Sequence, residues 1–114
     1  GNLPVDQHQL IALLAPRPVY VASASEDSWA DPRGEFLATR AAAEVYRLYG
    51  MATSEFSAMP AAGEALAGPI AYHLRAGKHD LLDFDWRHFL DFADCYVVAK
   101  ACCTDSNERR GQCT

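Results

Sequence analysis

A short apolar run rich in β-branched and aromatic residues, Val19–Ala24, constrains the fold of this chain more than any other feature. Such a run, without strict alternation of apolar and polar residues, suits a strand buried on both faces of a parallel sheet. A second strand is expected over Pro69–Leu74. Segments with helical character lie before, between and after these two. The order helix, strand, helix, strand, helix is typical of an α/β fold with parallel strands.

Turn and capping signals delimit the first two helices. One helix is expected over residues 6–15, with an aspartate in the N-cap position and Pro16 beyond its end. A longer helix is expected to start at Asp31-Pro32 and to run to about Tyr49, where Gly50 supplies the left-handed residue that ends it. Residues 51–68 are rich in Ala, Gly and Ser without a clean period, and we expect them to form a surface excursion.

A third helix is expected to begin near Asp85 and to pack one face onto the sheet. Five apolar side chains fall at helical spacing: Trp86, Phe89, Leu90, Ala93 and Val97. The two aromatic ones, Trp86 and Phe89, are expected in the core. The acidic residues around its start suit the helix dipole.

Two strands alone would leave both edges of their sheet uncovered, which is a poor basis for an independent domain. The chain starts at Gly1 without an initiator methionine or a visible signal peptide. Because the residues after Ala101 are too polar to supply a strand, we expect the missing strands to precede Gly1. On this view residues 1–101 are the C-terminal portion of a larger domain, and residues 102–114 are a disordered polar tail.

Composition and charge exclude several classes of protein. Of 114 residues 50% are hydrophobic, which is typical of one globular domain or part of one and not of a disordered chain. The net charge is −5 and the longest basic cluster is Arg109-Arg110, so a nucleic-acid surface is not expected. No apolar run approaches the roughly 18 residues that a membrane span needs.

The four cysteines all lie in the last 20 residues: Cys95, Cys102, Cys103 and Cys113. Their spacing matches no zinc-binding pattern. Free thiols and a disulfide such as Cys103–Cys113 are both compatible with the sequence, so the cysteines do not decide the redox compartment.

Polar side chains follow both predicted strands. The loop after the first strand holds Glu26, Asp27 and Asp31, and the loop after the second holds His79. In a parallel sheet the loops beyond the carboxyl ends of neighbouring strands lie together, so an acid and a histidine are expected to meet there. This is the orienting half of a Ser-His-acid system, in which the carboxylate fixes the imidazole and the imidazole takes the proton of the nucleophile. Asp31 already has a role as a helix cap.

The remaining histidines have simpler interpretations. His8, His73 and His88 are expected to be structural or solvated. The sequence favours an ordinary polar loop over a metal site built from His79, Asp80 and Asp83. No metal and no cofactor is expected.

Three stretches of the sequence resemble α/β-hydrolases of the glucuronoyl esterase family, carbohydrate esterase family 15. They are Leu3–Val19, Glu26–Phe36 and Gly77–Asp80, the last followed by Asp85-Trp86. The resemblance covers about residues 3–94 and implies the C-terminal part of an α/β-hydrolase fold with its last two strands. It also implies cleavage of the ester between glucuronic acid on xylan and lignin alcohols, and hence a parent enzyme that is secreted or periplasmic.

The resemblance assigns roles to individual residues. It implies that His79 is the catalytic histidine and that Asp27 is the acid, although in this family the acid can instead be a Glu after an earlier strand, which this chain lacks. It further implies that Trp29 lies near the uronic-acid site, where an aromatic ring can stack on the sugar.

The chain departs from the family in lacking the Gly-x-Ser-x-Gly-like nucleophile elbow and the arginine beside it. None of its serines sits in such a turn: Ser23, Ser25, Ser28, Ser54, Ser57 and Ser106. We therefore expect the parent to be a serine carboxylic-ester hydrolase and this chain alone to be inactive. The alternatives are part of an acetylxylan esterase or another α/β-hydrolase, and a small non-enzymatic α/β interaction domain that buries its strands against a partner chain.

Overall fold

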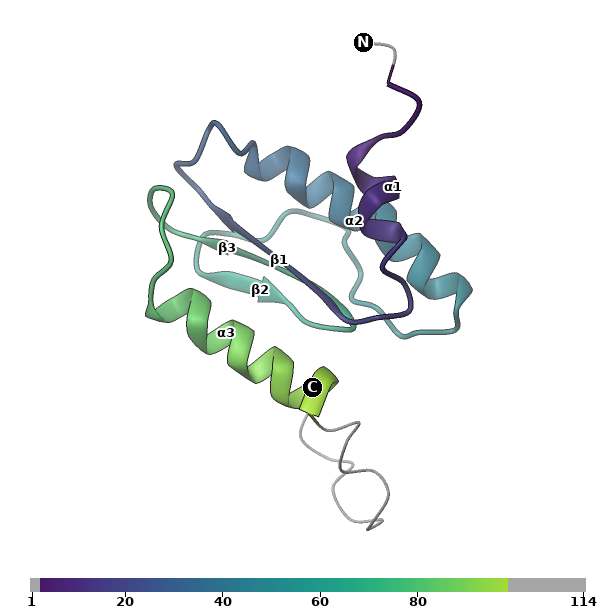
Figure 1. Ribbon diagram of the computed structural model, residues 1–114. Coiled ribbons are helices and arrows are strands. Elements are labelled where there is room, and N and C mark those ends of the chain that lie inside the picture. The colour runs from purple at the N-terminus through teal and green to yellow at the C-terminus, as the bar shows by residue number, and fades with distance from the viewer. Residues whose placement is uncertain (1–2, 99–114) are drawn as a thin grey trace. The chain divides into compact units, whose positions relative to one another are not determined.

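The computed structural model describes residues 3–98, which fall into two compact units. The first unit ends at Asp80 and contains α1 (Gln7–Ala12), β1 (Val19–Ala24), α2 (Pro32–Leu48), β2 (Glu64–Leu66) and β3 (Ile70–Arg75) (Figure 1). The second unit begins at Leu81 and contains α3 (Asp83–Ala93) and the π-helix η1 (Asp94–Val98). The predicted tail of residues 102–114 and its three cysteines lie outside the described residues.

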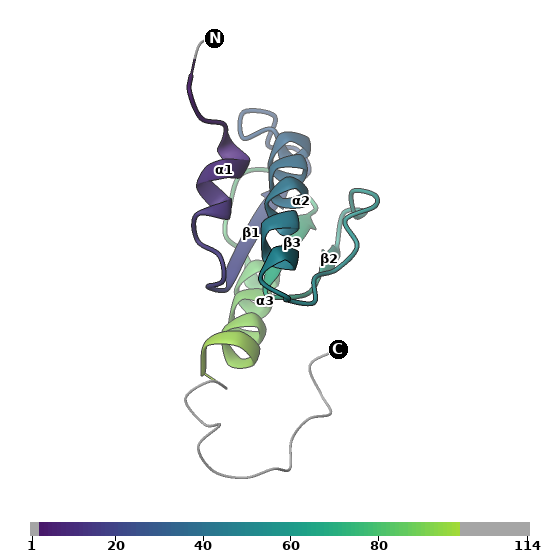
Figure 2. The same cartoon turned by 90° about the vertical axis from the view of Figure 1, so that its right-hand side faces the viewer.

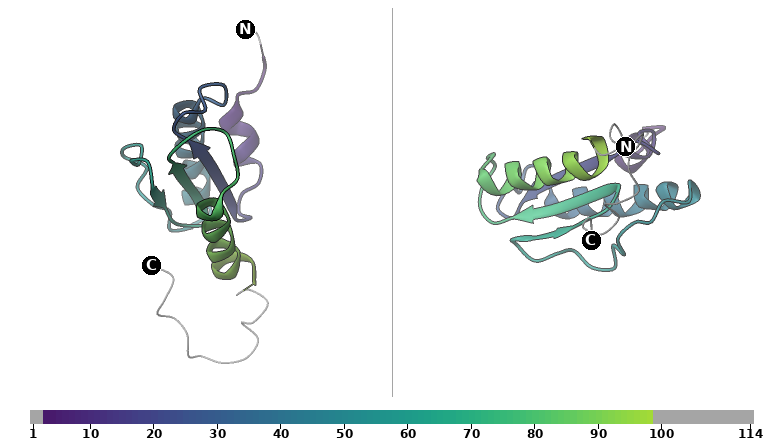
Figure 3. Two further views of the ribbon diagram at one scale, coloured as in Figure 1. Left: turned by 90° about the vertical axis from the view of Figure 1, so that its left-hand side faces the viewer. Right: turned by 90° about the horizontal axis from the view of Figure 1, so that it is seen from below.

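The first unit is built on a three-stranded sheet in the order β1-β3-β2 (Figure 3). The two strands predicted from the sequence are present, and they are parallel neighbours as expected. Their register pairs Val19 with Ile70 at one end and Ala24 with Arg75 at the other. The two strands therefore end level with each other, and the loops that follow them start from the same edge of the sheet.

The third strand, β2, was not expected, because it lies in the segment interpreted as a surface excursion. It pairs antiparallel with β3, from Glu64 opposite Leu74 to Leu66 opposite Tyr72, so the sheet is mixed. The same segment also buries the ring of Phe56 in the core. A three-residue strand has no period of its own to read, and its conformation follows from the backbone of β3.

The helix signals read from the sequence are used largely as expected. Asp6 caps α1 in a capping box with Gln9, but α1 ends at Ala12 because the following turn, up to Ala15, uses tighter three-residue hydrogen bonds. In α2 the carboxylate of Asp31 accepts from the Gly34 backbone N–H at 3.1 Å. Figure 2 shows α1 beside α2, with which it is in contact.

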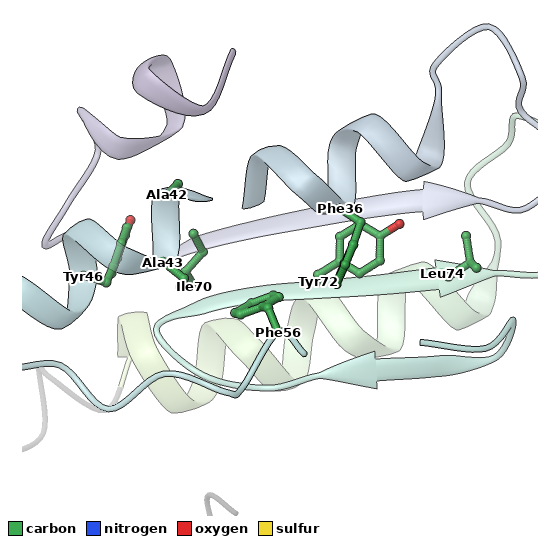
Figure 4. Packing of buried hydrophobic residues seen from close by; sticks show 8 residues of the cluster. All are labelled: Phe36, Ala42, Ala43, Tyr46, Phe56, Ile70, Tyr72 and Leu74. Carbon is green, nitrogen blue, oxygen red and sulfur yellow. The ribbon is translucent and has the colours of Figure 1, made fainter. Parts of the chain in front are cut away.

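The core of this unit lies between α2 and the sheet (Figure 4). Phe36 from α2 meets Tyr72 of β3 edge to face, with ring centroids 5.4 Å apart. The hydroxyl of Tyr72 donates to the Pro32 carbonyl at 3.0 Å, and the hydroxyl of Tyr46 donates to the Arg17 carbonyl at 2.6 Å. The first bond fixes the first turn of α2 against β3, the strand that precedes the histidine loop. The second ties the C-terminal part of α2 to the residues that lead into β1.

The second unit corrects the predicted face of the last helix. Its helix starts at Asp83, close to the expected position, but Trp86 is 54% exposed and not part of a core. Leu90 and Val97 are also exposed, whereas the carboxylate of Asp85 is buried. After Ala93 the helix widens into η1, which changes the angular spacing that the prediction assumed. Across the described residues no helix has the length and apolarity of a membrane span.

Candidate functional site

The loops after β1 and β3 bring Asp27 and His79 into contact. Nδ1 of His79 lies 2.6 Å from Oδ2 of Asp27, although the two residues are 52 positions apart in the sequence. The side chain of Asp27 is 11% exposed and that of His79 is 88% exposed. The acid and the histidine that the sequence placed at one sheet edge are therefore hydrogen-bonded there.

Backbone hydrogen bonds join the two loops beyond the ends of the strands. The Ser25 N–H donates to the Arg75 carbonyl at 2.8 Å, and the Glu26 N–H donates to the Gly77 carbonyl at 2.9 Å. The Gly77 N–H in turn donates to Oγ of Ser25 at 3.1 Å. The parallel ladder thus continues past the strands and fixes the spacing of the two loops that carry Asp27 and His79.

The environment of Asp27 favours its ionised form. The hydrogen bond from His79 is the largest cause of a lowered pKa of this carboxyl group. Burial raises this pKa in part, and the backbone N–H groups of Ala30 and Trp29 lower it. Oδ1 accepts from the Ala30 N–H at 3.3 Å. An ionised carboxylate can only accept, so the proton on Nδ1 of His79 points at Asp27, and Nε2 is the nitrogen left for other partners.

The other residues singled out in the first loop have different surroundings. The Trp29 side chain is 99% exposed, in the turn that Asp27 braces. Glu26 is exposed, and the carboxylate of Asp31 caps α2 as expected. Of the three candidate acids, Asp27 is the one that contacts His79.

A half-buried polar group that sequence analysis missed lies behind this loop. Oγ of Ser23 in β1 donates to the carboxylate of Glu35 in α2. Desolvation raises the pKa of Glu35, and the negative charges of Asp27 and Asp31 raise it further. Glu35 stands one turn into a helix, where the sequence gives no sign that it faces inward.

The remaining histidines have other partners. His73 is buried in β3, where its Nδ1 is 2.9 Å from the hydroxyl of Tyr20. Nδ1 of His8 is 3.8 Å from the Asp6 carboxylate, and Nδ1 of His88 is 2.9 Å from the Phe84 carbonyl. Within residues 3–98 no group of three metal-ligating side chains is present.

A cavity of about 620 Å³ lies between α1, β1 and the start of α2. Its lining includes Asp6, Asp31 and Glu35 but neither Asp27 nor His79. The Asp27–His79 pair is therefore on the open edge of the sheet and not in this hollow.

Comparison with known families agrees with the fold and with the resemblance noted in the sequence. Residues 1–50 match the family model described as glucuronyl esterase, fungi. The chain is 48% identical over 100 residues to carbohydrate esterase MZ0003 from an unknown prokaryotic organism, a match that covers 88% of this chain and 23% of the relative.

Two solved structures superimpose closely on the chain. A glucuronoyl esterase from Solibacter usitatus matches with a TM-score of 0.80 and 42% identity, over 85% of this chain and 25% of that one. A promiscuous CE15 esterase from a marine bacterial metagenome matches with a TM-score of 0.76 and 49% identity, over 83% and 24% of the two chains. The chain thus spans about a quarter of the length of these relatives.

Proposed function

Because this chain is related in sequence and in α/β-hydrolase fold to the C-terminal part of carbohydrate esterase family 15, we propose that it supplies the histidine and the acid of a serine carboxylic-ester hydrolase. The observation that carries the proposal is the contact between Nδ1 of His79 and Oδ2 of Asp27 at the carboxyl ends of two parallel strands. A carboxylate on one imidazole nitrogen leaves the other to move protons.

In this mechanism His79 acts as base and then as acid. Nε2 accepts the proton of a serine hydroxyl, contributed by the rest of the protein, as its oxygen attacks the ester carbonyl. The proton passes from Nε2 to the leaving alcohol, and an acyl-enzyme remains. A water molecule then gives its proton to Nε2, its oxygen attacks the acyl carbon, and the acid is released as the serine is re-protonated. Asp27 stays ionised throughout and stabilises the imidazolium.

The proposed substrates are glucuronic-acid esters of the kind that join xylan to lignin. Trp29 is proposed to contact the sugar, because its indole is fully exposed on the loop that carries Asp27. An aromatic face of this kind packs on the C–H surface of a sugar ring, and its N–H donates to a hydroxyl.

The test is ester hydrolysis by the complete protein that contains this chain. We expect His79→Ala to lower kcat by about 10⁴-fold or more and Asp27→Asn by about 10²- to 10⁴-fold. Glu26→Gln is the matched control, since it removes a neighbouring acid that does not contact His79, and it should leave kcat unchanged. Full activity in His79→Ala would overturn the proposal.

The isolated chain gives a second test. It should hydrolyse no ester, because no serine among the described residues is hydrogen-bonded to His79. Ser23 donates to Glu35, and Ser25 accepts from the Gly77 N–H. Turnover by the isolated chain would mean that one of its own residues is a nucleophile. If the isolated chain binds a partner chain, and neither it nor the complete protein hydrolyses an ester, the alternative of an interaction domain is favoured.

A broader ester specificity is the second candidate, favoured by the open position of Trp29 and by a relative described as a promiscuous CE15 esterase. Comparing kcat/KM for a methyl glucuronate ester and for an acetylated xylan oligomer separates the two. If the indole contacts the uronic acid, Trp29→Ala should lower kcat/KM for the glucuronate ester and leave kcat/KM for the acetylated oligomer unchanged. An equal loss on both substrates would favour the broader specificity.

A further inference from the structure

The last residue of β3, Arg75, organises the loop that follows it. Its Nη1 donates to the Ala76 carbonyl at 2.9 Å, and its Nη2 donates to the carbonyls of Lys78 and Asp80 at 2.7 and 3.0 Å. The residue is 5% exposed. A guanidinium group thus sits inside the turn and holds three of its carbonyl groups.

The two carbonyls on Nη2 belong to the residues immediately before and after His79. The imidazole itself is 88% exposed, so side-chain packing does little to hold it. Its position therefore depends on two things, the backbone held by Arg75 and the hydrogen bond to Asp27. Without the first, the second would have to order a mobile loop by itself.

Gly77 adapts the turn to the guanidinium. Its φ of +105° suits glycine, and a Cβ at this position would lie 3.3 Å from Nη1 of Arg75. The backbone thus passes close to the charged group where a side chain would crowd it. Lysine could not replace the arginine here, because one ammonium group cannot span three carbonyls that two guanidinium nitrogens reach in a fixed plane.

We propose that Arg75 is a positioning residue that holds the backbone of His79 in place for proton transfer. The proposal rests on the function proposed above for His79. It adds a residue that acts through the main-chain carbonyls on both sides of the histidine. Misplacing a catalytic group by about 1 Å can cost on the order of 10²-fold in rate.

The experiment compares Arg75→Lys with Arg47→Lys in the complete protein. Arg47 is a matched control, because its guanidinium also braces a loop, through Thr53 and the Ser54 carbonyl, but that loop does not carry the site. We expect Arg75→Lys to lower kcat by about 10²-fold with little change in KM, and Arg47→Lys to change neither.

A second readout does not depend on activity. The Nδ1 proton of His79, hydrogen-bonded to Asp27, should give a downfield resonance in the proton NMR spectrum of the wild type. This signal should be lost or broadened in Arg75→Lys and kept in Arg47→Lys. The two substitutions can also be combined. Arg75→Lys should lower kcat by a smaller factor in the Asp27→Asn background than in the wild type, since both changes act on the same imidazole.

The outcomes separate this proposal from the function. An inactive wild type whose Nδ1 signal disappears in Arg75→Lys would overturn the function and support the positioning role. An active wild type with kcat and the Nδ1 signal intact in Arg75→Lys would overturn the positioning role. If Arg75→Lys does not fold, Gly77→Ala disturbs the same turn from its other side, and unchanged kcat and signal in that variant would also overturn the proposal.

Discussion

The imidazole of His79 stands almost wholly in solvent, whereas the carboxylate of Asp27 that it contacts is largely shielded by its own loop. The carboxylate accepts from the Ala30 N–H, and backbone hydrogen bonds join its loop to the loop of the histidine. Nδ1 of the ring is therefore bonded to Asp27, and Nε2 remains accessible to a substrate or another chain at this edge of the sheet.

The titration of Asp27 should report its bond to His79. We expect the pKa of Asp27 to lie below its ordinary value of 3.8 and to rise when His79 is replaced by alanine, because that bond is the largest cause of the shift. The measurement is carbon-13 NMR of the carboxyl group. His8→Ala is the control and should leave the Asp27 titration unchanged.

The lowered pKa of Asp27 also makes the stability of the fold depend on pH. The folded state binds the Asp27 proton less tightly than the unfolded state does, so the contribution of Asp27 is complete above its ordinary pKa and is lost as the pH falls through the lowered value. The wild type should therefore lose more stability than His79→Ala on acidification below about pH 4. Equal losses in urea unfolding of the two proteins would contradict this explanation.

Glu35 should show the opposite behaviour. Desolvation raises its pKa, so the folded state favours the protonated form, and stability declines as the pH rises from the ordinary pKa of the group through the raised one. Glu35→Gln should be at least as stable as the wild type at pH 8 and should flatten this part of the stability profile, since a glutamine oxygen can still accept from Ser23. Glu44→Gln, on the exposed side of the same helix, is the control and should keep the wild-type slope.

Two glycines with positive φ separate backbone strain from crowding. Gly77→Ala and Gly63→Ala should each cost about 1–3 kcal/mol of stability, because φ is +105° and +94° at these positions. A Cβ at Gly63 meets nothing within 4 Å, whereas a Cβ at Gly77 approaches Arg75. We therefore expect the greater loss in Gly77→Ala by chemical denaturation. A greater loss in Gly63→Ala would show that crowding at the guanidinium is unimportant.

The hydroxyl of Tyr46 should matter for stability more than that of Tyr49. Tyr46→Phe removes the donor to the Arg17 carbonyl and should cost about 0.5–1.5 kcal/mol in urea unfolding. Tyr49, a few residues further along the helix, is 60% exposed, and its replacement by phenylalanine should change stability very little. Equal effects of the two substitutions would mean that the buried bond contributes nothing net.

The strands and the Asp27–His79 contact could be predicted because each depends on a local signal and one topological rule. The run from Val19 to Ala24 has strand composition throughout, and level parallel strands bring the loops after them together. The helix cap at Asp31 is similarly local, since one aspartate followed by a proline determines it.

The parts that were not predicted depend on contacts made through space. Glu64–Leu66 forms a strand because β3 offers it a backbone, and nothing in these three residues requires one. The carbonyls that Arg75 holds have no sequence pattern, since any residue supplies a carbonyl. Helical spacing predicts a core position for Trp86, but spacing identifies a face of the helix without saying what covers it, and the residue is exposed.

The two edges of the sheet in residues 3–80 differ, because one is formed by β1 and the other by β2. On one side β2 reverses direction after only three residues, one of them a glutamate, and so offers a poor template to another chain. On the other side β1 runs for six residues, and no strand of the described chain pairs with its outer edge. A further strand can therefore be added to this sheet along β1. The short β2 edge instead disfavours edge-to-edge pairing of two copies of the sheet.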